Sequence, residues 1–521
     1  MAYILVYDAG TGSVRAVLFN QDGEQVIALQ EEWVHEEDPR YPGSMNFNTE
    51  KNWGIIKDLT KRILAKTQID PGQIKAISAT SMREGFVLVN AEGKEIWACA
   101  NVDARATEEV VQLKTSRPGL EDALYKKSGQ TLALGAIPRL HWIQTHQPEI
   151  YEQAAGLVML NDWILFKLTH HLQVDPSNGC TTGLFDLEKR TWSSELATEC
   201  GIKPSLLPKV NEASTSLGGV TPLCASETGL LEGTPVFCGG GDAQMASIGV
   251  GAINENETFI CGGSFWQQMI NTCTPSVDDQ CRIRVNCHAV KDLWQLEAIA
   301  FVPGLVMRWF RDAFCDLEKM EAEAKGIDVY DLLEEKAKDV PVGSNGIISI
   351  FSDVMNFKSW RHASPSFLNL NFDHYPIGKK ELFRSIQENA ALVTLGNLLL
   401  IKEATGYFPD LAIFAGGASK GKLWSQTLAD VLGIPIKVPV IKEASALGTA
   451  LMAGVGAGLF ENIGEAVKQA VKWERLHTPD LKKHQAYLSL YERWKVVYKE
   501  QLKLADSGLT TPMWKAPGAT Y

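Results

Sequence analysis

The sequence predicts an α/β protein built from two similar domains that face each other. The chain has 521 residues, which is more than one hydrophobic core usually serves. In its first half, apolar runs of strand type alternate with helical patterns. A glycine- and proline-rich zone over residues 201–241 is followed, at residues 257–271, by a segment with the same pattern as the N-terminus. That segment repeats the order of the N-terminus, an apolar run, a glycine turn with a hydroxyl residue and another apolar run.

The individual elements follow from the same patterns. The expected strands of the first half are 4–7, 14–19, 74–80, 85–89 and 158–160, and the expected helices include 49–66 and 162–168. Residues 411–438 read as strand, glycine turn, helix and strand. A long polar helix ends the chain, and its aromatic stripe predicts a face packed on the body: Tyr487, Tyr491, Trp494, Tyr498 and Leu502. The predicted domains are 1–247, 248–475 and a C-terminal helix and tail over 476–521.

Composition excludes several classes of function. The formal net charge is -12 and the pI is about 5.5, whereas nucleic-acid binding favours a basic face. No apolar run approaches the ~20 residues needed to span a bilayer, so no membrane partner is expected. The N-terminus shows no secretion signal, and ten cysteines without a CxxC pair indicate a reduced environment. A cytoplasmic protein is therefore expected.

The first candidate site lies in "YILVYDAGTGSVRAVLFN", at the turn between two apolar runs. One interpretation is an ordinary hairpin turn, in which glycine supplies a positive φ. The other is a phosphate cradle, in which glycine N–H groups and hydroxyls donate to an anion and a carboxylate holds a metal ion. The candidate residues are Asp8, Gly10, Thr11, Gly12, Ser13 and Arg15.

The second candidate is the turn Gly239-Gly240-Gly241-Asp242, which follows an apolar run and precedes a helical pattern. This order predicts that Asp242 stands at a helix N-terminus and points into a cleft. A simple N-cap aspartate is the alternative. An N-cap does not need three glycines, which favours close approach of another group to this backbone.

Two further glycine turns lie in the second half, Gly262-Gly263-Ser264 and Gly416 to Lys422. The latter fits G-x-x-x-x-G-K, but Leu423 replaces the Ser or Thr that a P-loop needs for Mg²⁺. A turn lying against an adenosine is the better interpretation. Glycine turns and carboxylates on two domains together indicate phosphoryl transfer, which needs phosphate donors, a metal ion and a base.

These motifs, in their order and spacing, resemble the FGGY family of carbohydrate kinases over essentially the whole chain. The resemblance implies two actin-like ATPase (RNase H-like) domains with ATP in the interdomain cleft. It implies that Asp242 is the general base and that Asp8 and Asp242 bind Mg²⁺. Other residues are implied to bind the phosphates and the nucleotide: Thr11, Ser13, Arg15, Gly263, Ser264, Gly416, Gly417 and Gly421.

The resemblance also suggests a substrate side. Arg83 and Glu84 resemble a pair that grips polyol hydroxyls, for which a guanidinium and a carboxylate are suited, and a structural ion pair is the alternative. Asp103 is expected to contact a second hydroxyl, whereas Arg105 could equally be structural. Phe265 and Trp266, after the second phosphate turn, are expected near the substrate. They differ from the residues of glycerol kinase there, so glycerol is not the expected substrate.

Several long segments, including "WACANVDARA" and "GLTTPMWKAPG", resemble one branch of the family. That branch uses ATP to phosphorylate a small polyhydroxy carbonyl quorum-sensing signal, linear 4,5-dihydroxy-2,3-pentanedione, on its terminal hydroxyl. The product is retained in the cell and induces uptake of the signal. A pentulose kinase of the same family is one alternative, and an actin- or chaperone-like ATPase switch is another. The resemblance also allows a regulatory partner from the sugar-phosphotransferase system, although no residue identifies one.

Overall fold

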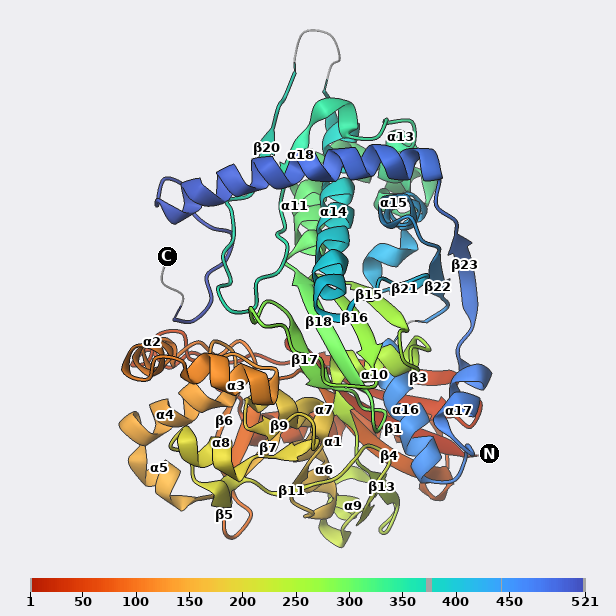
Figure 1. The fold of residues 1–521 in the computed structure, drawn as a ribbon. Helices are drawn as coiled ribbons and strands as arrows, with labels where there is room; N and C mark the ends of the chain where they lie inside the picture. Colours follow the sequence, from red (N-terminus) through yellow and green to blue (C-terminus); the bar gives the residue numbers. More distant parts are fainter. Residues whose placement is uncertain (1, 372–376, 442, 519–521) are drawn as a thin grey trace.

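The computed structural model describes residues 2–371, 377–441 and 443–518 and shows two α/β lobes joined across a broad contact (Figure 1). Met1, 372–376, Lys442 and 519–521, which the predicted domains include, lie outside the described residues. Each lobe is organised around a sheet of seven strands. The prediction of two similar α/β domains is confirmed, because the two sheets repeat one arrangement.

The first sheet has the order β12-β13-β4-β1-β2-β3, and β14 also pairs with β4. β1 is antiparallel to β2 and parallel to β4. Its strands are β1 (Tyr3–Ala9), β2 (Ser13–Asn20), β3 (Gln25–Glu32), β4 (Ile74–Ser81), β12 (Ser216–Gly219), β13 (Pro235–Phe237) and β14 (Gly240–Gly241).

The second sheet has the order β17-β18-β16-β15-β21-β22-β23. β15 is antiparallel to β16 and parallel to β21, as β1 is to β2 and β4. Its strands are β15 (Thr258–Gly262), β16 (Trp266–Thr272), β17 (Arg284–Cys287), β18 (Trp294–Ala300), β21 (Ala412–Ala415), β22 (Ile436–Pro439) and β23 (Trp473–His477). The pattern that residues 257–271 share with the N-terminus is therefore also a repeat in the structure.

Smaller sheets complete the lobes. One has three strands, β5 (Phe86–Asn90), β6 (Glu95–Cys99) and β7 (Ala154–Met159). The strand predicted over 158–160 is the end of β7, because Leu160 already begins a helix. The remaining pairs are β8 (Gln173–Val174) with β11 (Lys209–Val210), β9 (Phe185–Asp186) with β10 (Thr191–Trp192), and β19 (Ile348–Ile350) with β20 (Ser366–Leu368).

The helices before β15 are α1 (Thr49–Thr67), α2 (Thr107–Ser116), α3 (Leu120–Ser128), α4 (Ala136–His146), α5 (Pro148–Gln153), α6 (Leu160–Thr169), α7 (Pro176–Gly179), α8 (Ser194–Glu199), α9 (Pro222–Thr228) and α10 (Asp242–Gly249). Those after it are α11 (Pro303–Phe314), α12 (Asp316–Lys325), α13 (Val329–Ala337), α14 (Lys379–Thr405), α15 (Lys422–Leu432), α16 (Ala444–Gly456), α17 (Ile463–Ala470) and α18 (Leu481–Asp506). Three of the four aromatic residues of the α18 stripe, Tyr487, Tyr491 and Trp494, are buried.

The chain returns to the first lobe after the second sheet has begun. α16 packs on α10, β1 and β4, and its apolar side joins the cluster that contains Ile4, Val6 and Phe19. α10 and α16 cross in backbone contact, because a Cβ on Gly448 would lie 1.9 Å from the Met245 carbonyl oxygen. The helix that carries Asp242 is thus fixed by a segment from the second half of the sequence.

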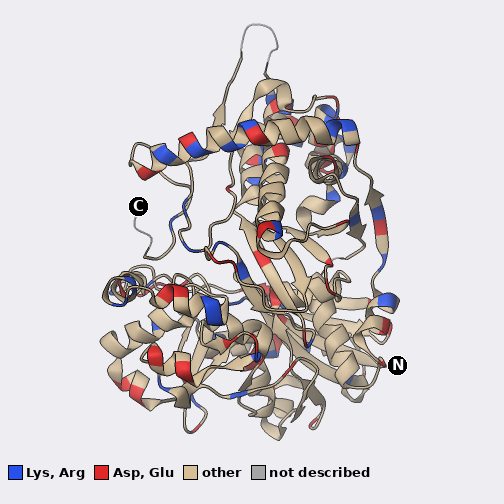
Figure 2. Ribbon diagram, in the orientation of Figure 1, with Lys and Arg blue, Asp and Glu red and all other residues tan. Residues whose placement is uncertain are grey.

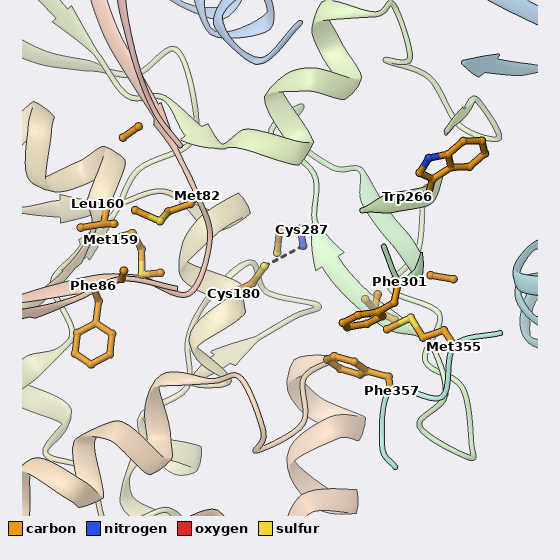
Figure 3. Packing of buried hydrophobic residues seen from close by; sticks show 14 of the residues in the cluster. Met82, Phe86, Met159, Leu160, Cys180, Trp266, Cys287, Phe301, Met355 and Phe357 are labelled. Carbon is orange, nitrogen blue, oxygen red and sulfur yellow. Dashed lines mark hydrogen bonds between the residues drawn. The ribbon is translucent and has the colours of Figure 1, made fainter. Parts of the chain in front are cut away.

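The two lobes also share a hydrophobic core. One cluster of buried residues runs from Leu5 in the first sheet to Trp494 in α18, and Figure 3 shows parts of it on both sides of the contact. The strand β17 lies against the first lobe, where Cys287 N donates to Cys180 Sγ (3.3 Å; Figure 3). Tyr125 of α3 donates to the carbonyl oxygen of Ile283, just before β17 (2.5 Å). Hydrogen bonds therefore join the two lobes at this contact.

Charged residues of both signs alternate along the same elements, as α18 shows (Figure 2). No helix within the described ranges is long and apolar enough to cross a membrane. All ten cysteines fall in those ranges and are free thiols, as a reduced environment predicts.

Candidate active site

Two neighbouring cavities share a wall, the turn between β15 and β16. The larger, about 930 Å³, lies between the lobes, and the smaller, about 390 Å³, lies within the second lobe. Gly263 and Ser264 line both. Both volumes are of the size that holds small ligands. A group bound at this turn could therefore contact ligands in the two cavities at once.

Asp242 stands on the wall of the larger cavity as the first residue of α10, as the sequence predicts. Its side chain is 36% exposed, and one carboxylate oxygen accepts from the backbone N–H of Ala243 (2.7 Å). Helix N-termini favour a negative charge. Within the described ranges no side chain donates a hydrogen bond to the other oxygen, so this carboxylate can accept a proton from a ligand.

The three glycines before Asp242 are required by the protein's own backbone. A Cβ on Gly239 would lie 1.8 Å from the Ala79 carbonyl oxygen, and one on Gly240 would lie 2.5 Å from Ser177 Oγ. Gly241 N donates to that same hydroxyl (3.0 Å). The close approach that the glycines indicated is real, but the approaching groups are β4 and α7. Together they fix where α10 begins.

Arg83 and Glu84 line the cavity, and each is bound by a residue of the second sheet. Arg83 donates twice to Glu297 (2.5 and 2.7 Å), which is fully buried. Glu84 pairs with Arg284 at 2.5 Å. Arg83 Nε also faces Asp242 at 4.0 Å. These residues form ion pairs that bridge the lobes and also face the cavity, so a role in binding hydroxyl groups stays a prediction.

Burial and nearby charges together determine the pKa of Asp242. Loss of hydration raises the pKa of Asp242 to about 6, Arg83 opposes this rise, and Glu84 adds to it. A base works best when its pKa lies near the working pH. Asp242 is consequently mostly ionised at neutral pH and still basic enough to take a proton.

The first glycine turn presents one side chain to the cavity, that of Thr11. Asn101 Nδ2 donates to Thr11 Oγ1 (3.0 Å). Asp8 is buried below the turn and lies 3.7 Å from Arg15 Nη1. Burial raises the pKa of Asp8 to about 7, Arg15 lowers it, and the charges of Asp242 and Glu443 raise it further. Gly10, Gly12 and Ser13 complete the turn but line neither cavity within the described structure.

The Gly262–Ser264 turn packs against the turn that begins at Gly416. Gly416 has φ 100°, and a Cβ there would lie 2.8 Å from the Gly262 carbonyl oxygen. Gly417 and Gly421 line the smaller cavity with Trp424, while Gly416 supports the turn from behind. Glu334 accepts from the backbone N–H groups of Leu423 and Trp424 (2.9 and 3.0 Å). An acidic side chain thus occupies the N-terminus of α15, where a P-loop would hold phosphate.

The remaining predicted substrate residues separate into two groups. Asp103 and Phe265 line the larger cavity. Arg105 pairs with Asp103 at 2.7 Å and lies over the rings of Trp97 and Trp142, so its role is structural. Trp266 is fully buried against Phe414 and Trp424 and lines neither cavity. Figure 3 shows Trp266 well apart from Phe301, which does line the larger cavity.

Sequence reasoning missed residues of the second sheet and the tail. Glu297 is the single acid in the apolar run Trp294–Ala300, the same signal that identified Asp8. Arg284, in β17, lies outside every motif identified from the sequence. Trp514, Ala516 and Gly518 of the tail line the larger cavity, and no local pattern predicts that.

The carboxylates near the cavity fit a weakly coordinated Mg²⁺. No cluster of three or more metal-binding side chains occurs within the described residues. Mg²⁺ bound with phosphates usually takes only one or two carboxylates and keeps several waters. The charge of Asp242 raises the pKa of Asp8, and a bound cation would lower it.

A carboxylate on the wall of an interlobe cavity, next to a second cavity across a glycine–serine turn, fits a two-lobed phosphotransferase with an alcohol acceptor. Residues 3–249 match the model of the FGGY family of carbohydrate kinases, N-terminal domain, and residues 266–457 match that of its C-terminal domain. The chain belongs to the FGGY family of carbohydrate kinases.

Relatives and solved structures agree with this family. A protein named autoinducer-2 kinase from Escherichia coli is 50% identical over 517 residues, 99% of this chain and 98% of that protein. One of the same name from Yersinia enterocolitica is 49% identical with the same coverage. A ligand-bound xylulose kinase from Lactobacillus acidophilus has a TM-score of 0.85 at 21% identity, over 97% of this chain and 99% of that one. Plasmodium falciparum glycerol kinase with ADP has a TM-score of 0.82 at 20% identity, over 96% and 98%. The predicted actin-like fold of two domains is confirmed.

Proposed function

We propose that this kinase transfers the γ-phosphoryl group of ATP to the terminal hydroxyl of linear 4,5-dihydroxy-2,3-pentanedione, the linear form of autoinducer-2. The chain is 50% identical, over 99% of its length, to a protein named autoinducer-2 kinase. This identity is the observation that carries the choice of acceptor. The reaction type follows from the family and from the two cavities that meet at Gly263 and Ser264.

The two cavities suggest how the substrates are arranged. The nucleotide occupies the smaller cavity with its adenosine beside Gly417 and Gly421, and the acceptor occupies the larger one. The Gly263–Ser264 turn then lies where the phosphoryl group passes between them. Thr11 faces the same space from the first lobe, and hydroxyl and N–H donors at both turns would stabilise the charge of the transferring group.

The chemical step is an in-line displacement at the γ-phosphorus. The acceptor oxygen forms the new O–P bond, the bond to the bridging oxygen of ADP breaks, and ADP leaves. The acceptor proton goes to Asp242, whose raised pKa suits it as the base. Arg83, held by two bonds from Glu297, keeps a positive charge beside Asp242 and so favours its ionised form.

Bound Mg²⁺ would offset the charge of the phosphates during transfer. Asp8 and Asp242 are the carboxylates that would hold it, directly or through water. On the acceptor side, Glu84 and Asp103 supply oxygens for hydroxyl groups. Because Arg284 and Arg105 already bind these carboxylates, their orientation is set before the acceptor arrives.

We also assign the reaction to the cytoplasm, where ATP is available and free thiols persist. Phosphorylation adds negative charge to a small neutral molecule, so the product would be retained there. A regulatory protein of the sugar-phosphotransferase system remains a family-based expectation.

The decisive test is an ADP-release assay on the purified protein with Mg-ATP. Dihydroxypentanedione, D-xylulose, L-ribulose and glycerol are compared with a reaction lacking acceptor. Turnover that is strong only with dihydroxypentanedione is expected. Preference for a pentulose would overturn the acceptor assignment and retain the fold and mechanism, whereas ADP release without acceptor would favour an ATPase switch.

A further inference from the structure

The end of the described chain runs along the larger cavity from the second lobe to the first. After α18, the backbone N–H of Met513 donates to the carbonyl oxygen of Ala363 in the second lobe (3.2 Å). Farther along, Gly518 lies against α2 of the first lobe, where a Cβ on it would come within 2.4 Å of Val110 Cγ1. Residues 514–518 all line the cavity. Figure 1 shows this segment descending from α18 towards α2.

Trp514 completes an aromatic wall of that cavity. Its ring stacks on Phe301, with centroids 4.8 Å apart and planes at 27°, and meets Trp360 edge-on at 5.3 Å. Phe301 in turn meets Phe265 at 5.6 Å. All four rings line the cavity, and three come from the second lobe's body while Trp514 comes from the tail. Without Trp514 the wall would lose the one of these four rings that the tail supplies.

The backbone beside this wall is held in an unfavourable conformation. Trp360 and Val302, which follows Phe301, both have φ 50°. Bulky and β-branched residues rarely adopt a positive φ, and such residues persist where the surrounding structure imposes them. The aromatic rings are therefore placed where local backbone preference alone would not put them.

The opposite side of the cavity is polar. Arg83, Glu84, Asp103 and Asp242 line it from the first lobe. A cavity with one polar and one aromatic side suits a short molecule that carries hydroxyls at one end and an apolar group at the other. A molecule with hydroxyls along its whole length would bury some of them against the rings without partners, which is unfavourable.

We propose that Trp514 is a specificity-determining residue for the acceptor. It contacts the end remote from the reacting hydroxyl and selects a methyl-bearing dicarbonyl over a fully hydroxylated pentulose. This inference rests on the proposed function, both for the identity of the acceptor and for its place in the larger cavity.

The test compares full-length wild type with Trp514→Ala and Trp514→Phe in the ADP-release assay. Trp514→Ala is expected to raise KM for dihydroxypentanedione about tenfold, as loss of apolar contact does, and to leave KM for ATP within twofold. Its selectivity for dihydroxypentanedione over D-xylulose should fall by a similar factor, and Trp514→Phe should restore most of it. Trp473→Ala is the matched control, since Trp473 is 40% exposed and lies outside both cavities, and it should retain wild-type constants.

A second variant keeps the test informative if Trp514→Ala unfolds. Gly518→Val would displace the tail from Val110 without removing any ring, and it should raise the acceptor KM while ATP KM stays unchanged. An acceptor KM within twofold of wild type in a folded variant, or an equal rise in both KM values, overturns the inference. If wild type prefers another acceptor, the proposed function fails, and the same comparison of KM values with that acceptor still decides the role of Trp514.

Discussion

The turns of the two equivalent hairpins, β1–β2 and β15–β16, are built on different principles. In the first, a buried carboxylate, Asp8, faces Arg15, and a Cβ added to Gly12 at the tip would meet no neighbouring atom of the described residues within 4 Å. In the second, the turn sequence contains no charged residue and its first glycine, Gly262 at the end of β15, is closely packed. A Cβ on Gly262 would lie 2.5 Å from the Phe414 ring, and one on Gly304 would lie 2.2 Å from the Gly263 carbonyl oxygen.

The difference shows how a repeated fold divides one task. The first lobe places charge at the cleft, through Asp8, Asp242 and Arg83. The second lobe places backbone at the cleft, with glycines that bring the turn against the nucleotide side. Substitutions in the first lobe should therefore act mainly on chemistry, and those in the second should act mainly on packing.

The largest effect is expected from Asp242→Asn, which removes the base and preserves shape. Loss of general base catalysis should lower kcat by about 10²–10⁴-fold, while the Kd for ATP, measured by direct titration, stays near that of wild type. Near-normal turnover would remove Asp242 from the role of base and would leave the first lobe without its chemical function.

Glu297→Gln tests whether a carboxylate of the second sheet stabilises the buried charge of Arg83 in the first lobe. Arg83 would keep its buried charge and lose its main carboxylate partner, so unfolding in urea should show a loss of about 3–5 kcal/mol. The matched control is Glu403→Gln, because Glu403 pairs with Arg282 and is 64% exposed. The control should change stability by less than about 1 kcal/mol, and equal effects of the two variants would contradict the buried clamp.

The same substitution in both turns tests the packing difference directly. Gly262→Ala should destabilise the protein by about 1–3 kcal/mol, as overpacking does, whereas Gly12→Ala should stay within about 0.5 kcal/mol. Thermal unfolding measures both. Comparable losses of Tm would mean that the two turns are equally constrained.

The smallest expected effect is the pH dependence of the free enzyme. Asp242 acts as a base when ionised, and its pKa is raised to about 6, so kcat/KM should be halved near that pH and fall further as the pH is lowered. The residual activity of Asp242→Asn should lack this limb. A wild-type profile that stays flat down to about pH 5 would contradict the assignment.

The sequence was sufficient for features that are local in the chain. Asp8 and Asp242 stand out because each interrupts an apolar or glycine-rich run. Asp242 lines the interlobe cavity, and Asp8 is buried below a turn that presents Thr11 to it. The repeat was visible because each hairpin is continuous in sequence. The partners of Arg83 and Glu84 were not predictable, because Glu297 and Arg284 lie far along the chain and only the docking of β17 and β18 brings them close. Trp266 is the opposite case, because the sequence predicts it near the substrate and the structure places it in the core. Its neighbour Phe265 faces the cavity, whereas the alternation of side chains along β16 buries Trp266.

The crossing of α10 and α16 has a consequence for protein engineering. Gly249 and Gly448 leave no space for a side chain, since a Cβ on Gly249 would lie 2.0 Å from the Ala444 carbonyl oxygen. The helix that carries Asp242 is thus matched to α16, a helix from the second half of the chain. Chimeras that join the first half of one family member to the second half of another, at the end of α10, would have to preserve this contact. A recombinant of this kind should therefore fold only if glycine is kept at both crossing positions, 249 and 448.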